Sequence, residues 1–223
     1  MGSKPQRKIK IRWSSNFAYA LGLIVSDGWL SLDGRHIGFK SADVELVEKF
    51  RIALNIKNII GRGVRSNERV KKYYYVTFGD IIFYQFLNEI GIKPTKSKII
   101  KSVSVPNKFF RDFLRGLFDG DGTCYSFWDI RWPNSFVFQI SFSSASLDFT
   151  KWLKNKLNRL YNVKGFIAIG DGVYNIRYFK GDSEKLFSVM YYKKGLLFLN
   201  RKYVKMKNIL IKNRQIKLNK SPR

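Results

Sequence analysis

The sequence has one cysteine, one histidine and few acidic residues, and these shortages exclude several classes of protein. With Cys124 alone, no intramolecular disulfide can form and no cysteine cluster can hold zinc. With His36 as the single histidine, a cysteine–histidine nucleophile pair would need an unusual arrangement. No apolar run approaches the roughly 18 residues that cross a bilayer, and the charged N-terminus lacks the apolar segment of a secretory signal. We therefore expect neither a membrane protein nor a disulfide-stabilised secreted one.

The shortage of acidic residues leaves a large positive charge. There are 16 Asp and Glu against 42 Lys and Arg, which gives a net charge of +26. Both parts of the chain share the excess, with 19 basic and 8 acidic residues up to Pro106 and 23 and 8 after it. Because Tyr, Ser and Asn are interleaved with the cations, and no basic amphipathic helix stands out, nucleic acid is favoured over a membrane surface. The alternative, a protein that its charge merely keeps dispersed, explains so large an excess poorly. We expect the basic runs at 4–12 and 201–223 to contact phosphates without reading sequence.

The chain contains a repeated motif. Residues 20–28 read ALGLIVSDG and residues 114–122 read LRGLFDGDG, so that Asp27 aligns with Asp121 at a spacing of 94 residues. Each motif ends in Asp-Gly, which is typical of a helix that stops at the glycine. One such match could arise by chance, whereas several in the same order indicate an internal duplication.

Two further matches keep the order of the repeat. Ile37–Ala42 resembles Ile140–Ala145, and Gly-Asp pairs recur further along each half. An insertion around 125–135 accounts for the wider spacing downstream. We therefore predict two halves, 1–106 and 107–223, each long enough to bury a core.

The hydrophobic periodicity predicts the same elements in both halves. In the first half we expect helices ending at the Asp-Gly of the motif, then over 43–54 and 80–90, with strands over 29–31, 36–40, 57–65 and 71–78. In the second half we expect helices from 108 to the motif, then over 146–161 and 182–191, with strands near 123 and over 136–143, 165–169 and 173–179. The predicted class is α+β, with two αββαββα repeats whose antiparallel sheets are covered by helices on the outer face.

The alternation of side chains predicts which residues occupy the uncovered sheet faces. If Ile37, Phe39, Val76 and Phe78 point to the helices, their neighbours point away. These neighbours are His36, Lys40, Lys71, Tyr73, Tyr75 and Thr77 in the first half, and Gln139, Ser141, Ser143, Asn175 and Arg177 in the second. A solvated face would also be polar, but the charge favours a DNA-reading surface. To it we add Ser31, Arg62, Arg65 and Arg131 from adjoining segments.

Small residues recur every four positions in the motif helices, as Ala18, Gly22 and Ser26 in the first and as Gly116 and Gly120 in the second. This spacing places them on one helix face, where two backbones can approach closely. We therefore predict that the two halves meet helix to helix.

Such packing would bring Asp27 and Asp121 together at the helix C-termini. The partial negative charge there repels carboxylates and favours a cation between them, and oxygen ligands suit Mg²⁺. Metal-assisted hydrolysis of a phosphodiester fits two carboxylates on a basic surface. Either Asp-Gly alone would be ordinary turn chemistry, but their equivalent positions favour a site. Asp119 is a weaker candidate, because its counterpart in the first half is Val25.

The two motifs resemble those of a single-chain LAGLIDADG homing endonuclease. The resemblance covers nearly the whole chain and implies two saddle-shaped sheets that straddle duplex DNA, with cleavage that leaves short 3′ overhangs. It further implies that Asp27 and Asp121 bind Mg²⁺, which Ca²⁺ or Mn²⁺ can replace, with help from the carbonyl groups of Ser26 and Gly120. The first motif departs from the pattern at residues 25 and 26 but keeps its final aspartate.

The same resemblance implies a basic or amide residue at the end of a sheet strand, and a lysine after the third helix of each repeat. Lys40, or Gln139 or Ser143, fits the first role, and Lys96 and Lys202 fit the second. They would polarise water or screen the charge on the phosphate. In so basic a chain, a phosphate contact is the competing interpretation for each lysine.

The sequence thus favours a monomeric, Mg²⁺-dependent endonuclease that cuts double-stranded DNA at a long, non-palindromic site. The alternatives are an RNA-binding intron maturase of the same fold and a non-catalytic DNA-binding module. Without a targeting segment, we expect synthesis in the compartment that holds the DNA, either a prokaryotic cytoplasm or an organelle.

Overall fold

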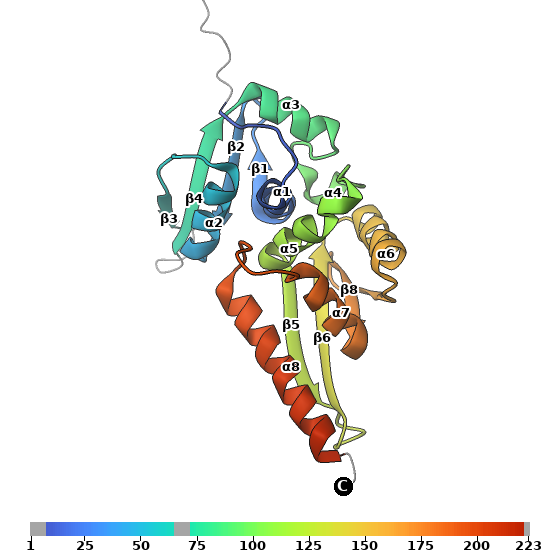
Figure 1. Cartoon of the computed structure of the whole chain (residues 1–223). Coiled ribbons are helices and arrows are strands. Elements are labelled where there is room, and N and C mark those ends of the chain that lie inside the picture. Colours follow the sequence, from blue (N-terminus) through green and yellow to red (C-terminus); the bar gives the residue numbers. More distant parts are fainter. Residues whose placement is uncertain (1–7, 65–71, 221–223) are drawn as a thin grey trace, which may run out of the picture.

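The computed structural model describes residues 8–64 and 72–220, and the element order is the predicted repeat of α-β-β-α-β-β-α (Figure 1). The first half contains α1 (Ser15–Asp27), β1 (Gly28–Leu30), β2 (His36–Ser41), α2 (Val44–Leu54), β3 (Gly61–Val64), β4 (Lys72–Gly79), α3 (Ile81–Glu89) and α4 (Lys96–Ile99). The second half contains a 3₁₀ turn (Asn107–Phe109), α5 (Phe110–Gly120), β5 (Gly122–Trp128), β6 (Phe136–Ser144), α6 (Leu147–Tyr161), β7 (Phe166–Ile169), β8 (Tyr174–Phe179), α7 (Lys180–Met190) and α8 (Asn200–Lys220).

Two four-stranded antiparallel sheets form the body of the fold. Their strand orders are equivalent, β1-β2-β4-β3 in the first half and β5-β6-β8-β7 in the second. Ile37, Phe39, Val76 and Phe78 are buried beneath the helices, which confirms the predicted inward face. Each sheet therefore has one face on the core and one face that no helix of its repeat covers within residues 8–64 and 72–220.

The helix ends follow the capping residues in the sequence. Ser14 begins α1, because its side chain accepts a hydrogen bond from the backbone N–H of Phe17, and Gly28 ends it. Ser146 caps α6 in the same way, through the N–H of Phe149. These caps fix where α1 and α6 begin.

The halves meet at the crossing of α1 and α5, near the centre of the molecule (Figure 1). A Cβ atom added to Gly22 would lie 2.2 Å from the carbonyl oxygen of Phe113, and one added to Gly116 would lie 2.1 Å from that of Tyr19. Neither position tolerates a side chain, since both neighbouring atoms belong to backbone. The predicted helix-to-helix contact is confirmed.

The second half differs from the first in the insertion around 125–135. Most of it extends the β5–β6 hairpin, so β5 has seven residues where β1 has three. The basic run after residue 200 is a long helix, α8, which lies along this hairpin (Figure 1). Lys212 of α8 lies 5.2 Å from the ring centroid of Phe136. The described part of the run, expected only to contact phosphates, therefore also covers the outer face of the hairpin.

Candidate metal and nucleic-acid site

Each motif aspartate lies where a central helix turns sharply into the first strand of a sheet. Asp27 is the last residue of α1, and Asp121 directly follows α5. The next residue is a glycine in both cases. A Cβ on Gly28 would lie 2.7 Å from the Cα of Ile24, and one on Gly122 would lie 2.5 Å from the Cα of Phe118. The Asp-Gly pairs are therefore needed for the tight turn as well as for the carboxylate.

The two carboxylates come from opposite halves and influence each other electrostatically. Loss of water around Asp27 raises its pKa to about 6, and the charge of Asp121 adds to that rise. Asp121 is more exposed, but loss of water raises its pKa as well. Among the residues that the structure describes, neither carboxylate receives a hydrogen bond. Two adjacent anionic groups without donors are a suitable place for a cation.

The close approach of the halves here depends on Gly120. A Cβ on this residue would lie 3.0 Å from Oδ2 of Asp27 and would overlap the hydroxyl of Ser26. The Ser26 hydroxyl itself donates to the carbonyl oxygen of Leu23, 3.0 Å away. The small residues of the motifs thus bring the acidic end of α1 against the end of α5.

Lys96 and Lys202 hold the two turns in equivalent ways. Each lies in the first turn of the helix that ends its repeat, α4 or α8, and each is buried. Nζ of Lys96 donates to the carbonyl oxygen of Gly28 at 2.6 Å. Nζ of Lys202 donates to the corresponding oxygen of Gly122 at 2.6 Å, and to two further carbonyl groups, those of Phe118 and Gly120.

These hydrogen bonds concern two sequence predictions, the role of the two lysines near the metal and the Gly120 carbonyl as a metal ligand. Burial lowers the pKa of both lysines to about 8, while the nearby carboxylates of Asp27 and Asp121 favour the protonated form. The ammonium group of Lys202 uses its three donors on backbone oxygens, so its geometry is that of a group that positions the turn. The Gly120 carbonyl, a predicted metal ligand, is one of these acceptors and keeps a second lone pair.

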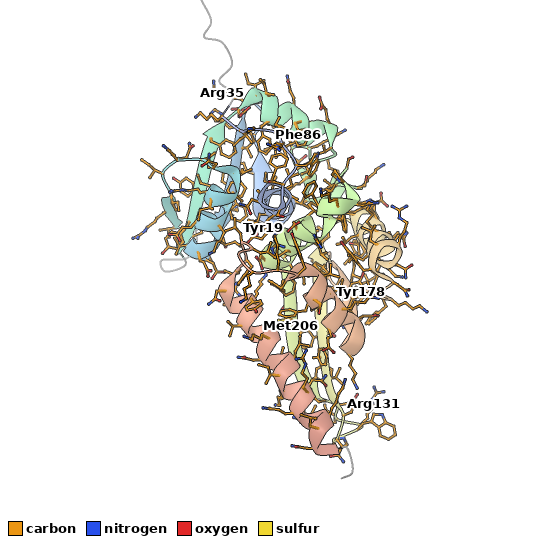
Figure 2. All side chains as sticks on the ribbon, viewed as in Figure 1. Tyr19, Arg35, Phe86, Arg131, Tyr178 and Met206 are labelled. Carbon is orange, nitrogen blue, oxygen red and sulfur yellow. The ribbon has the colours of Figure 1, made fainter. Side chains whose placement is uncertain are left out.

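Asp119 points into the core, away from the two motif carboxylates. Its Oδ2 accepts hydrogen bonds of 2.7 Å from the hydroxyl of Tyr19 and from the backbone N–H of Leu199, and burial raises its pKa to about 6. Figure 2 shows Tyr19 where α1 and α5 meet. The sequence analysis missed this buried network, together with the Asp112–Arg115 ion pair on the same helix. The signal was present, because residues 112, 115 and 119 form one stripe at helical spacing.

The open face of the first sheet carries most of the predicted DNA contacts. Lys40 is exposed, with Nζ 6.0 Å from the ring centroid of Tyr73. The rings of Tyr73 and Tyr75 lie against Gly63 and Gly61 of the next strand, and Thr77 shares this face.

The turn between β1 and β2 holds two more predicted contacts. His36 is partly exposed and its Nδ1 pairs with the carboxylate of Asp33. The backbone N–H of Ser31 donates to the carbonyl group of His36, and its own carbonyl oxygen accepts from the hydroxyl of Tyr84.

Three predicted DNA contacts are placed otherwise than expected. Arg62 pairs with Tyr74 in the β3–β4 register and lies over that ring at 5.6 Å, on the helix-covered face of the sheet. Gln139 and Ser141 do alternate to the open face, but both are buried because larger neighbours on the adjacent strands cover them. Arg65 and Lys71 lie outside the described residues.

The remaining predicted contacts of the second half are accessible. Ser143 donates to Oδ1 of Asn175 at 2.6 Å, and Arg177 is partly exposed. Arg131 lies at the far end of the β5–β6 hairpin (Figure 2), where its guanidinium is 3.7 Å from the carboxylate of Asp129.

Comparison with known proteins identifies the fold. No protein-family description matches the sequence, and no curated protein matches it either. Solved structures do match. The homing endonuclease I-WcaI bound to its DNA recognition sequence has a TM-score of 0.59 at 15% identity, covering 83% of this chain and 88% of that one. The chain has a LAGLIDADG-like fold.

Two other proteins with this LAGLIDADG-like fold are similar. Full-length DUF199/WhiA from Thermatoga maritima has a TM-score of 0.56 at 16% identity, covering 94% of this chain and 67% of that one. I-DmoI in complex with DNA and Ca has a TM-score of 0.54 at 16% identity, covering 81% and 91%. At these identities the likeness shows the fold alone, and it is shared by homing endonucleases and WhiA.

The donors at the centre of this LAGLIDADG-like fold suit a hard divalent cation. Within 8–64 and 72–220, no group of three or more His, Cys, Asp and Glu side chains lies together. A metal would therefore be held by Asp27, Asp121, backbone oxygens and water, which is the oxygen-rich set that Mg²⁺ and Ca²⁺ prefer. A cavity of about 270 Å³, lined in part by Ser26, Asp121 and Ser143, opens beside these groups. No described helix is both long and apolar enough to cross a bilayer.

Proposed function

We propose that this protein is a site-specific endonuclease that hydrolyses phosphodiester bonds of double-stranded DNA with Mg²⁺. The observation that carries the proposal is the meeting of Asp27 and Asp121 at the ends of α1 and α5, where no described residue donates a hydrogen bond to either carboxylate and loss of water raises both pKa values. Asp27 and Asp121 would hold a divalent cation there, which would supply activation of water and stabilisation of the leaving oxygen of the phosphate. Ca²⁺ and Mn²⁺ can bind to the same oxygen ligands.

The protein's own residues have separable roles in this proposal. Lys96 and Lys202 position the two aspartates by fixing the carbonyl groups of the turns that carry them. Lys40 is exposed on the open sheet face. Its positive charge partly offsets the rise in the pKa of Asp27, so the two groups influence each other electrostatically. Lys40 is therefore placed to neutralise charge on a phosphate group near the metal.

The remaining surface supports duplex DNA as the substrate. The net charge of +26 favours a polyanion, and the two open sheet faces carry polar and aromatic groups that can read base edges. Because both aspartates belong to one chain, a monomer suffices. The faces differ in sequence, so the target is long and non-palindromic, and cleavage leaves the short 3′ overhangs that the motifs imply.

Two other functions compete with this one. The fold also occurs in WhiA, so fold alone does not choose between a nuclease and a non-catalytic DNA-binding module. An RNA-binding intron maturase would use the same basic surface. Two carboxylates that accept no hydrogen bond within the described part of the chain favour the nuclease, because neither alternative needs two carboxylates at this position.

Cleavage of a plasmid library with randomised target inserts tests the proposal. We expect double-strand cleavage with Mg²⁺, none with EDTA, and recovered ends with 3′ overhangs at one family of sequences. A variant with both Asp27→Asn and Asp121→Asn is the matched control, because it keeps the shape of the site and removes its charge. Lack of cleavage with Mg²⁺ and Mn²⁺, by a protein that still retains DNA, would overturn the nuclease in favour of the binding module.

A further inference from the structure

The cavity of about 270 Å³ beside the end of α5 lies between the two halves of the protein. The first half contributes Val25 and Ser26 of α1, with Ser97 and Ile100 at α4, and the second half contributes residues of α5, β6, α6 and β8. The hydroxyl of Ser146 donates to the carbonyl oxygen of Ile100, which holds the end of α4 against the start of α6 (Figure 1). Protein interiors rarely leave spaces larger than a water molecule, and the smallest ligand pockets measure about 300 Å³. A space of this size is therefore a candidate binding site.

The floor of the cavity is apolar. The buried apolar residues that line it are Val25, Ile100, Leu117, Phe142, Phe149, Leu153 and Ile176. Thr150 is also buried there, and its hydroxyl donates to the carbonyl oxygen of Ser146 at 2.7 Å, so its donor is used within the protein. An engineered apolar cavity of about 150 Å³ stays dry and binds benzene. The floor thus has room for an aromatic ring with a short chain.

The rim of the cavity is polar and contains a carboxylate. Its residues are partly or fully exposed, and they are Ser26, Ser97, Asp121, Ser143, Ser144 and Ala145. The hydroxyl of Ser26 donates to the carbonyl oxygen of Leu23 at 3.0 Å, and that of Ser143 donates to Oδ1 of Asn175 at 2.6 Å. Both hydroxyl oxygens keep lone pairs, and no described residue donates to the carboxylate of Asp121. The rim therefore offers mainly acceptors to a ligand.

A protonated amine with an apolar body matches this division between floor and rim. An ammonium group has three donors and no acceptor, and its hydrogen bonds to a carboxylate are about twice as strong as those between neutral groups. The carboxylates of Asp27 and Asp121 offset the nearby charges of Lys96 and Lys202, so the rim does not repel a cation. The remaining excess of basic residues is largely screened beyond about 8 Å at physiological salt.

We propose that this cavity binds a small amphipathic amine, with its apolar body against Phe142, Phe149 and Leu153 and its ammonium group on Asp121. Binding of such a compound needs neither nucleic acid nor a metal. Its effect on cleavage does rest on the proposed function. An ammonium group on Asp121 takes a carboxylate that the divalent cation needs, so the compound would inhibit the nuclease.

An NMR titration at neutral pH without divalent cations tests the site, with 2-phenylethylamine as the probe. The matched neutral compound is 2-phenylethanol, which keeps the ring and lacks the charge. We expect saturable binding of both to the wild type, about tenfold tighter for the amine. Ethylamine, which lacks the ring, should bind much more weakly than either. In Asp121→Asn, the amine should lose its advantage over the alcohol.

A tryptophan at the rim shows where the probe binds. Ala145→Trp should close the mouth, because Ala145 is partly exposed at the rim, and should weaken binding of both compounds about tenfold or more. Ser188→Trp is the matched control, since Ser188 is exposed on α7 and is not among the residues that line the cavity. If Ala145→Trp does not fold, Ser97→Trp makes the same comparison from the α4 side of the mouth.

Three results would overturn the inference. The first is the absence of saturable 2-phenylethylamine binding to the wild type, and the second is unchanged binding in the tryptophan variants of the rim. The third is equal affinity of the wild type for amine and alcohol, because it would remove the ammonium group from Asp121. None of these results depends on cleavage, so the inference and the proposed nuclease can fail separately.

Discussion

Gly22 and Gly116 face each other across the crossing of α1 and α5. A Cβ atom on Gly116 would lie 3.0 Å from the Cα of Gly22 and 2.1 Å from the carbonyl oxygen of Tyr19. Because backbone atoms occupy this space, a side chain here must force the two helices apart. The same crossing brings the motif aspartates together, so stability and the proposed activity depend on one contact.

Gly116→Ala should therefore destabilise the protein by about 3 kcal/mol, the upper part of the range for overpacked positions. Urea unfolding measures the change. Gly181→Ala is the matched control, because this helical glycine has no atom within 4 Å of an added Cβ, and alanine is the better helix former. A Gly116→Ala variant as stable as Gly181→Ala would contradict the tight crossing.

Asp27→Asn should abolish cleavage and, at neutral pH, raise the free energy of unfolding. The folded-state pKa of about 6 is above the ordinary 3.8, so the native state holds the proton more tightly between these values. Wild-type stability accordingly falls as the pH rises through this window, and asparagine removes that fall. We expect a gain of about 1–2 kcal/mol near neutral pH, reduced for partial exposure, and none near pH ~4. Urea unfolding at both pH values, with DNA retention as the control, checks the prediction.

Divalent cations should stabilise the protein through the same two carboxylates. Ca²⁺ at about 100 times its dissociation constant would add about 2.7 kcal/mol to the free energy of unfolding. The increase in melting temperature should be smaller at mildly acidic pH, since protons then compete for Asp27, whose pKa is about 6. A melting-temperature increase of the same size in the Asp27→Asn, Asp121→Asn variant would place the ion elsewhere.

Lys202→Met should cost more stability than Lys96→Met. Lys202 donates to three backbone carbonyl groups, whereas Lys96 donates to one. Leaving buried acceptors unpaired costs roughly 1–3 kcal/mol each, which the burial cost of the lysine charge partly offsets. We expect losses of about 3 and 1 kcal/mol in urea unfolding. Equal losses would contradict a larger structural role for Lys202.

The fold could be predicted from the sequence because its strongest signals are local. The repeated motif, Ser14 and Ser146 as caps, and the alternation around Ile37 and Phe39 each act within a few residues. The helix α8 was not predicted, because the many basic residues between its apolar positions make the helical spacing of those positions hard to recognise in the sequence. Burial of Gln139 depends on side chains two strands apart, which alternation within one strand does not include.

The candidate site was predicted in part for the same reason. The symmetry of the motifs was enough to predict that Asp27 and Asp121 would come together across the halves. The backbone oxygens that accept hydrogen bonds from Lys96 and Lys202 could not be predicted, because a lysine in a basic chain gives no indication of which backbone oxygen it reaches. Arg62 was added to the DNA-reading surface from an adjoining segment, without a strand register, and its pairing with Tyr74 places it on the helix-covered face instead.

In the proposed function, the unequal lengths of α4 and α8 would set how far each half reaches along a duplex. The first turn of α8 contacts the Asp121 turn through Lys202, and its later turns support the hairpin that ends near Arg131. A straight helix of 21 residues spans about 30 Å, which matches roughly nine base pairs of DNA. A helix of fixed length along the hairpin would hold the outermost recognised base at a constant distance from the cleaved bond. Shortening α8 turn by turn would trim the recognised sequence from its outer end inward.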